Sequence, residues 1–171
     1  MKKILLLTLI LTPFLYFSQA NLDSAFVYYW EDELEGDVYY STNYDMVIAN
    51  SEKTKGAKIS VHVNRDGELA FLTAKLIGLG NCVKDNEMII LFENEEKIFL
   101  KSWNDFNCKG NAYFSLSKPQ LSLLRNNPMK TVRIRNGENY KSVTSSDFSN
   151  PNYYMEIISC IDRKVFTLLV E

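Results

Sequence analysis

The sequence predicts a β-rich α+β domain, in which an antiparallel sheet built from consecutive hairpins carries two packed helices. Three observations support this class. Apolar and polar residues alternate on either side of turn dipeptides, one hairpin is apolar on both faces and therefore needs cover on each, and two segments carry helix-capping residues. An all-β sandwich or barrel is the alternative arrangement.

The first 20 residues have the three regions of a secretory signal peptide: two lysines, an apolar run over residues 4–17, and a Ser-Gln-Ala stretch that ends at Ala20. The run contains Pro13 and is shorter than the roughly 20 residues of a membrane span. We therefore expect cleavage after Ala20 and a secreted or periplasmic protein. Residues 21–171 would form a single exported domain with no membrane span after signal removal.

Cleavage takes two of the 19 Lys and Arg and none of the 21 Asp and Glu, which leaves 17 against 21 and a net charge of −4. This charge argues against non-specific binding to nucleic acid or anionic membranes. No phosphate loop, nucleophile elbow or zinc spacing is present. The sequence predicts no cofactor and no metal.

Residues 21–50 are aromatic and acidic, and their secondary structure is ambiguous. Tyrosine-rich segments favour strands, but the alternation is poor, and a helical turn near Ser24 is compatible with the pattern. Only residues 45–49 read as a short strand.

The first clear hairpin turns at Asp66-Gly67. A two-residue turn there predicts an apolar face that pairs Val63 with Ala70, Val61 with Leu72 and Ile59 with Ala74. The opposite face carries Ser60, His62 and Asn64 against Thr73, Phe71 and Leu69.

The second hairpin lies between Cys82 and Cys108. A turn at Asn94-Glu95 predicts that Leu91 pairs with Ile98 and Ile89 with Leu100, and on the other face Phe92 with Lys97, Ile90 with Phe99 and Met88 with Lys101. Extended outward, this register sets Cys82 opposite Asn107, one position from Cys108. We expect a disulfide between the two cysteines, worth about 3 kcal/mol of stability by loop closure. Cys160 is the alternative partner for either one.

The remaining elements follow from local signals. Residues 112–116 read as a strand, and a Ser-x-x-Gln capping box from Ser117 to Gln120 opens a short helix that ends before Pro128. A third hairpin turns at Asn136-Gly137 and sets either Ile134 or Arg133 opposite Tyr140, according to loop length. Asn150 and Pro151 open a last helix, although the chain from Val165 onward fits a strand as well. That helix has apolar residues at helical spacing: Tyr154, Ile157, Ile158, Ile161, Val165 and Leu168.

One pattern resembles a family of small exported proteins of Bacteroidota that have no assigned function. It comprises Cys82-Val-Lys, Ile-Ile-Leu-Phe-Glu93, Asn104-Asp-Phe-Asn-Cys108, Leu123 and Val132-Arg-Ile-Arg-Asn-Gly137. These relatives tend to have Asp-Gly where this chain has Asn94-Glu95. The resemblance covers roughly residues 56–161; it implies export and a shared fold, and it implies nothing about chemistry.

The sequence contains no recognisable catalytic set, so it predicts a non-enzymatic extracytoplasmic binding or structural module rather than an enzyme. The candidate binding surface combines aromatic and acidic residues with two arginines of one strand face: Trp30, Glu31, Asp32, Glu33, Arg133 and Arg135. The aromatic residues could stack on sugar rings and the arginines could bind an anion. The partner would be an envelope protein or a glycan.

Two other functions stay open. One is a secreted hydrolase that acts on glycans through paired carboxylates, and the other is an inhibitor or immunity-type protein that presents an apolar patch or an edge strand. His62 is the sole histidine. We expect a partly exposed strand residue there rather than a metal ligand or a catalytic base, because metal sites need several ligands.

Overall fold

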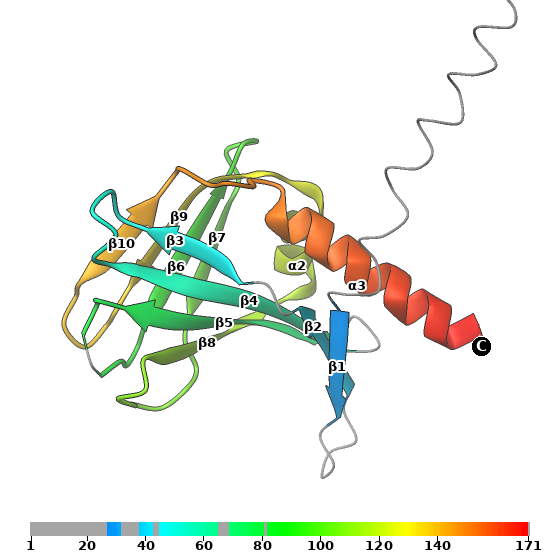
Figure 1. Ribbon diagram of the computed structural model, residues 1–171, viewed down its shortest axis with the longest axis horizontal. Coiled ribbons are helices and arrows are strands. Elements are labelled where there is room, and N and C mark those ends of the chain that lie inside the picture. The colour runs from blue at the N-terminus through cyan, green and yellow to red at the C-terminus, as the bar shows by residue number, and fades with distance from the viewer. Residues whose placement is uncertain (1–26, 32–37, 43–44, 65–68, 81, 171) are drawn as a thin grey trace, which may run out of the picture.

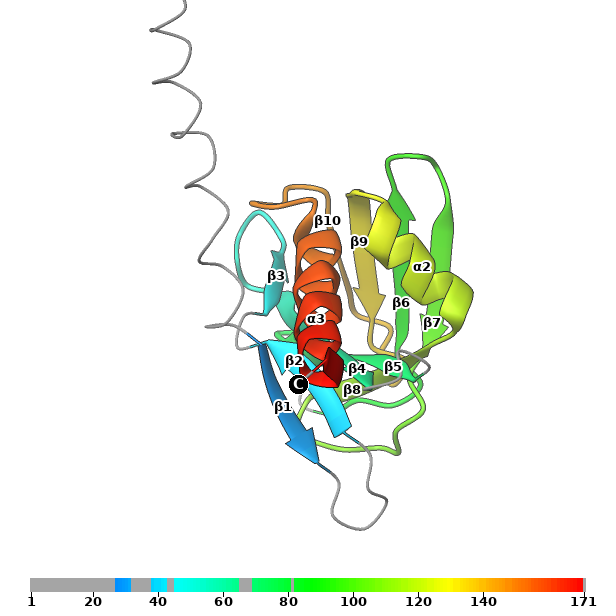
Figure 2. The same ribbon diagram turned by 90° about the vertical axis from the view of Figure 1, so that its right-hand side faces the viewer.

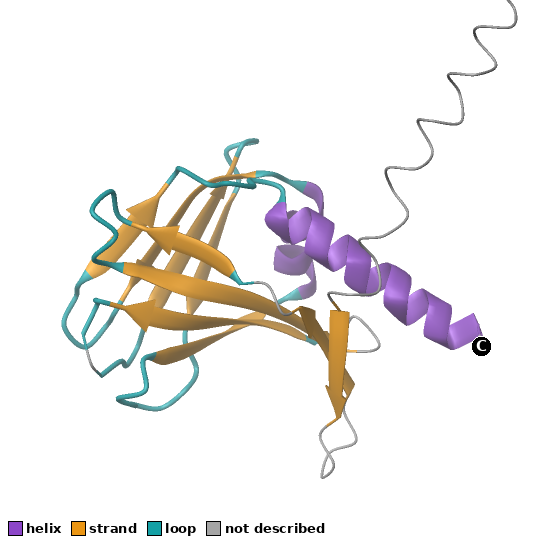
Figure 3. Cartoon of the chain, viewed as in Figure 1, coloured by secondary structure: helices purple, strands orange, loops and turns teal. Residues whose placement is uncertain are grey.

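The computed structural model describes residues 27–31, 38–42, 45–64, 69–80 and 82–170 (Figure 1). It confirms the predicted α+β class: two antiparallel sheets face each other, and two helices lie together at one end of them (Figure 3). The predicted signal peptide, the helical turn near Ser24 and the Asp66-Gly67 turn lie outside the described residues.

The six-stranded sheet has the order β1-β2-β4-β5-β8, with β3 paired to the first half of β4. Its strands are β1 (Val27–Glu31), β2 (Val38–Thr42), β3 (Met46–Ala49), β4 (Gly56–Asn64), β5 (Ala70–Ile77) and β8 (Asn111–Leu116). The aromatic N-terminal segment therefore contributes three strands: β3, which is the short strand predicted at residues 45–49, and β1 and β2 before it. The β4–β5 register is as predicted, since Val63 pairs with Ala70 and His62 with Phe71.

The four-stranded sheet has the order β10-β9-β6-β7. Its strands are β6 (Glu87–Phe92), β7 (Lys97–Lys101), β9 (Met129–Arg135) and β10 (Ser142–Ser145). At its edges, β7 lies near β8 and β10 lies near β3, so the two sheets enclose one core.

The predicted β6–β7 register is wrong by one position. Ile90 pairs with Ile98 and Met88 with Leu100, so these residues are buried, while Ile89 pairs with Phe99 on the outer face. The loop has three residues rather than two, because Glu95 adopts a left-handed conformation with φ of 68°. A type I turn followed by such a residue is the usual three-residue hairpin loop.

Both predicted registers of the third hairpin are also wrong. Ile134 pairs with Val143, and the N–H of Asn136 donates to the carbonyl of Lys141 over 2.9 Å. The loop is longer than expected because Asn136 is wholly buried and Tyr140 takes a positive φ of 59°. The Asn136-Gly137 dipeptide consequently anchors the loop instead of forming a tight turn.

The core lies between the sheets and is closed at one end by the helices (Figure 2). Helix α2 (Lys118–Asn126) begins as predicted: Gln120 accepts the N–H of Ser117 over 2.9 Å. Helix α3 (Tyr153–Val170) begins two residues after Pro151 and continues past Val165 as a helix, so the alternative strand is wrong. Arg125 of α2 and Asp162 of α3 form an ion pair at 3.0 Å. Among the described residues we find no helix with the length and hydropathy of a membrane span.

Candidate functional site

The outer face of the six-stranded sheet carries three cross-strand rows of side chains over β4, β5 and β8. Strand alternation turns apolar residues toward the core and leaves polar and aromatic residues outside. The rows follow from the pairings of β5: His62, Phe71 and Ser115; Ser60, Thr73 and Tyr113; Lys58, Lys75 and Asn111.

This face is hollowed into an open groove of about 720 Å³. Aromatic side chains border it, and hydroxyl groups from Ser60 and Thr73 lie among its lining. We call it the aromatic groove; its aromatic members are Tyr39, Phe71, Trp103 and Tyr113. Its volume lies within the range of small-molecule binding sites.

The aromatic residues form two pairs. Tyr39 meets Phe71 edge to face, with ring centroids 5.6 Å apart, and Trp103 tilts against Tyr113 at 5.4 Å. Trp103 remains 61% exposed, so most of its surface is available to a ligand. Buried aromatic side chains stabilise a fold, whereas an exposed tryptophan beside a hollow provides a platform for binding.

Backbone pairing and asparagine side chains hold Trp103 in place. The Trp103 N–H donates to the carbonyl of Tyr113 over 3.0 Å, and Asn104 Oδ1 accepts the Tyr113 N–H over 2.9 Å. Asn104 and Asn107 both donate to the carbonyl of Asn111, over 3.1 and 2.9 Å. The segment that carries Trp103 is thus tied to β8 although it follows β7 of the other sheet.

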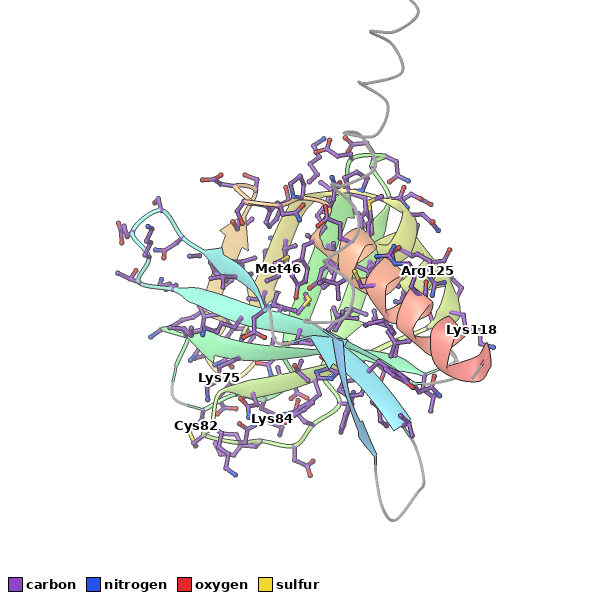
Figure 4. The ribbon with its side chains drawn as sticks, turned by 45° about the vertical axis from the view of Figure 1, so that its right-hand side comes forward. Met46, Lys75, Cys82, Lys84, Lys118 and Arg125 are labelled. Carbon is purple, nitrogen blue, oxygen red and sulfur yellow. A yellow bond between two sulfur atoms is a disulfide. The ribbon has the colours of Figure 1, made fainter. Side chains whose placement is uncertain are left out.

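The disulfide braces the same segment. Cys82 and Cys108 are bonded, as predicted, with their Cα atoms 3.8 Å apart, and the neighbouring Val83 and Asn107 exchange backbone hydrogen bonds. In Figure 4, Cys82 and Lys75 lie at the end of the molecule away from Lys118 and Arg125 of α2. Cys160 takes no part in this bond: it is buried on α3, where its Sγ accepts a hydrogen bond from Arg163 over 3.2 Å.

His62 lies in the groove opposite Phe71, where the sequence placed it. The two rings stack with centroids 4.6 Å apart, and the His62 Nε2 lies 3.2 Å from the Thr73 hydroxyl. Burial lowers the pKa of His62 to about 4, while the nearby negative charge of Asp45 raises it and offsets only part of that effect. At neutral pH His62 is therefore an uncharged hydrogen-bonding group.

The groove does not assemble a Ser-His-Asp relay from its lining residues. The Ser60 hydroxyl donates to the Asp45 carboxylate, while His62 contacts Thr73 instead. A relay needs the histidine between the hydroxyl and the acid. Asp45 is also the single carboxylate in the described lining, so a paired-carboxylate mechanism has no support from these residues.

The predicted binding-surface residues are divided between the two sheets. Trp30 and Glu31 belong to β1, paired with Tyr39 and Val38, whereas Arg133 and Arg135 belong to β9. Asp32 and Glu33 lie outside the described residues. The structure therefore does not bring the aromatic segment and the arginines onto one strand pair.

Sequence reasoning placed part of the groove and missed the rest. The β4–β5 register predicted that Ser60, His62, Phe71 and Thr73 share the outer face, but it gave no reason to add Trp103. The alternation of Asn111, Tyr113 and Ser115 along β8 was the available signal for that strand. Trp103 joins the groove through a contact between chain segments that no local pattern encodes.

The chain was also compared with known proteins. No protein-family model matches it, and the searches of curated proteins and of solved structures found no match either.

Proposed function

We propose that this chain is an exported, non-enzymatic binding module that holds a glycan chain in the aromatic groove. One observation supports the proposal above all: Trp103 is a largely exposed aromatic platform, held against Tyr113 beside a row of hydroxyl groups.

The groove matches the two surfaces of a sugar ring. A pyranose has apolar C–H faces that pack on aromatic rings, and hydroxyl groups that both donate and accept hydrogen bonds. Trp103 offers the flat apolar surface. Thr73, Asn111 and uncharged His62 offer groups that can donate and accept without a net charge.

Export is supported by the signal-peptide pattern of residues 1–20 and by the disulfide, because such bonds persist in oxidising compartments outside the cytoplasm. The experiment is expression of the full chain in a host with a secretory pathway, followed by N-terminal sequencing of the exported protein. We expect Asn21 as the first residue. A protein retained in the cytoplasm with Met1 intact would contradict export.

Glycan binding is tested on the mature chain with soluble hexasaccharides of glucose, xylose and N-acetylglucosamine. We expect at least one of them to bind, and Trp103→Ala to weaken that binding by about tenfold or more, as loss of a central aromatic anchor does. Phe106→Ala is the matched control, since Phe106 is an exposed aromatic residue of the same segment but does not line the groove. No binding to any of the sugars, or equal losses in the two variants, would overturn the proposal.

The same sugars separate binding from hydrolysis. Incubation of these hexasaccharides with the mature chain is expected to leave the number of reducing ends unchanged. Release of new reducing ends that Asp45→Asn abolishes would instead assign the chain to the glycan hydrolases, with Asp45 as one of the carboxylates.

A further inference from the structure

The outer face of the four-stranded sheet is the second distinctive surface of the molecule. Its strand pairings form three rows: Lys101, Glu87 and Arg135; Phe99, Ile89 and Arg133; Lys97, Leu91 and Thr131. We call this surface the basic face.

An apolar strip runs along the middle of the basic face. Phe99 is 65% exposed, and Ile89 and Leu91 beside it are half-buried. Lys97 and Lys101 lie on either side of Phe99 along β7, and the β9 arginines lie on the opposite side of β6. No described segment of the chain covers Phe99, so a large apolar side chain is left facing solvent between cations.

The charge of this face is opposite to that of the whole chain. Its rows hold four cations and one carboxylate, whereas the sequence has a net charge of −2. The carboxylate, Glu87, is already engaged by Arg135 over 2.6 Å. Arg133 is exposed and makes no ion pair with any described residue. The face therefore presents positive charge that the chain does not neutralise there.

Two shallow hollows on the face share Glu87 and Ile89 and are therefore adjacent. The first, of about 320 Å³, is also lined by Arg133, Arg135, Tyr140 and Ser142. The second, of about 340 Å³, is lined further by Met88, Phe99, Leu100 and Lys101.

The first hollow fits a carboxylate. Arg133 can donate to it in a fork, and the Ser142 hydroxyl lies in the same lining. Arg135 is held by Glu87 and by the Tyr140 ring, whose centroid is 5.8 Å from its guanidinium carbon. The second hollow fits an apolar side chain against Phe99.

We propose that the basic face docks an acidic polypeptide segment of a partner protein, with a carboxylate in the Arg133 hollow and a neighbouring apolar side chain against Phe99 and Ile89. Charge complementarity defines this occupant: with Arg135 engaged by Glu87, the three remaining cations of the rows, Lys97, Lys101 and Arg133, favour several carboxylates around an apolar residue. The two hollows can each take a single side chain. They therefore favour a polypeptide segment as the partner rather than a lipid surface, which is flat. This proposal is independent of the aromatic groove, which lies on the other sheet.

The test uses the mature chain and a synthetic probe peptide of sequence Glu-Glu-Phe-Glu-Glu with blocked ends. Titration followed by amide NMR is expected to shift signals of β6, β7 and β9, with an affinity that decreases as salt is added. Two control peptides test the roles of charge and of the apolar side chain: one has Gln in place of every Glu, and the other has Ala in place of Phe. Both are expected to bind with an affinity about tenfold lower, or lower still.

Variants localise the site. Arg133→Glu and Phe99→Ala are each expected to weaken peptide binding by about tenfold or more. Lys84→Glu is the charge-matched control, because Lys84 is exposed and lies outside the face, and it is expected to have a much smaller effect. Amide NMR spectra of the variants verify that each one is folded.

Three results would overturn the proposal: no shifts at millimolar peptide, equal binding of the Gln peptide, or equal effects of Arg133→Glu and Lys84→Glu. Vesicles of phosphatidylcholine with and without phosphatidylglycerol form the remaining arm. Binding to the anionic vesicles without binding to the peptide would assign the face to a lipid surface instead.

Discussion

The backbone N–H of Glu95 donates to the carbonyl of Phe92 over 3.1 Å, and Glu95 holds a left-handed φ of 68° to close the β6–β7 hairpin. A residue with a Cβ is strained in this conformation, whereas glycine is not. We expect Glu95→Gly to raise the melting temperature by roughly 2–4 °C, measured by circular dichroism.

Glu96→Gly is the control for this substitution. Glu96 is the next residue and does not have a positive φ. Glycine there relieves no strain, adds freedom to the unfolded chain and removes the hydrogen bond that the Glu96 carboxylate accepts from Asn94 Nδ2 over 2.6 Å, so it is expected to lower the melting temperature. Equal effects of the two substitutions would contradict the role of the left-handed turn.

His62 is expected to titrate with a pKa of about 4, because burial disfavours its charged form. Since the folded pKa lies below the unfolded value of 6.5, the unfolded state binds more protons between these two pH values. The contribution of uncharged His62 to the free energy of unfolding is therefore fully present above pH 6.5 and is lost as the pH falls toward 4.

The measurement is an NMR titration of the imidazole signals, which belong to the sole histidine of the chain. Denaturation of the His62→Gln variant in parallel separates the contribution of His62 to the pH dependence from that of the carboxylates. The free energy of unfolding of the variant should depend less on pH between 6.5 and 4 than that of the wild type. A midpoint near 6.5 would show that the ring is solvated.

Loss of the Cys82–Cys108 disulfide is expected to cost about 3 kcal/mol, since the bond closes a long loop of the unfolded chain. Urea denaturation of the Cys82→Ala/Cys108→Ala double variant measures this change. A reducing agent should destabilise the wild type and Cys160→Ala but not the double variant. Mass spectrometry of a non-reducing digest that finds both Cys82 and Cys108 as thiols would contradict the bond.

Asn136 anchors the β9–β10 loop from a wholly buried position. Its Nδ2 donates to the carbonyls of Leu79 and Cys82 over 3.0 and 2.8 Å. Asn136→Asp removes both donors and brings a carboxylate against two carbonyl oxygens, so we expect a loss of about 3 kcal/mol in urea denaturation.

Asn139→Asp is the matched comparison. Asn139 also donates to the carbonyl of Leu79, over 2.8 Å, but it is exposed, so water can replace the lost bond. We expect a loss below about 1 kcal/mol. Losses of similar size at the two positions would show that burial does not set the cost at Asn136.

Elements whose signals are local could be predicted from the sequence. Residues on either side of one turn fix the β4–β5 register, and Ser117 and Gln120 mark the start of α2 within four residues. The β6–β7 register could not be predicted in this way. A left-handed Glu95 leaves no sign in the sequence, and one extra loop residue exchanges the two faces of a strand.

The sequence by itself determined the α+β class and the outward position of His62 opposite Phe71, because each depends on periodicity or on residues brought together by one hairpin. It favoured the Cys82–Cys108 disulfide but left Cys160 as an alternative partner, and the structure decided between them. Only the tertiary structure decided that Trp103 borders the groove beside Tyr113 and that Ile89 lies between Arg133 and Phe99. Both arrangements depend on which segments pack side by side, and that is set by burial of the whole core rather than by any local pattern.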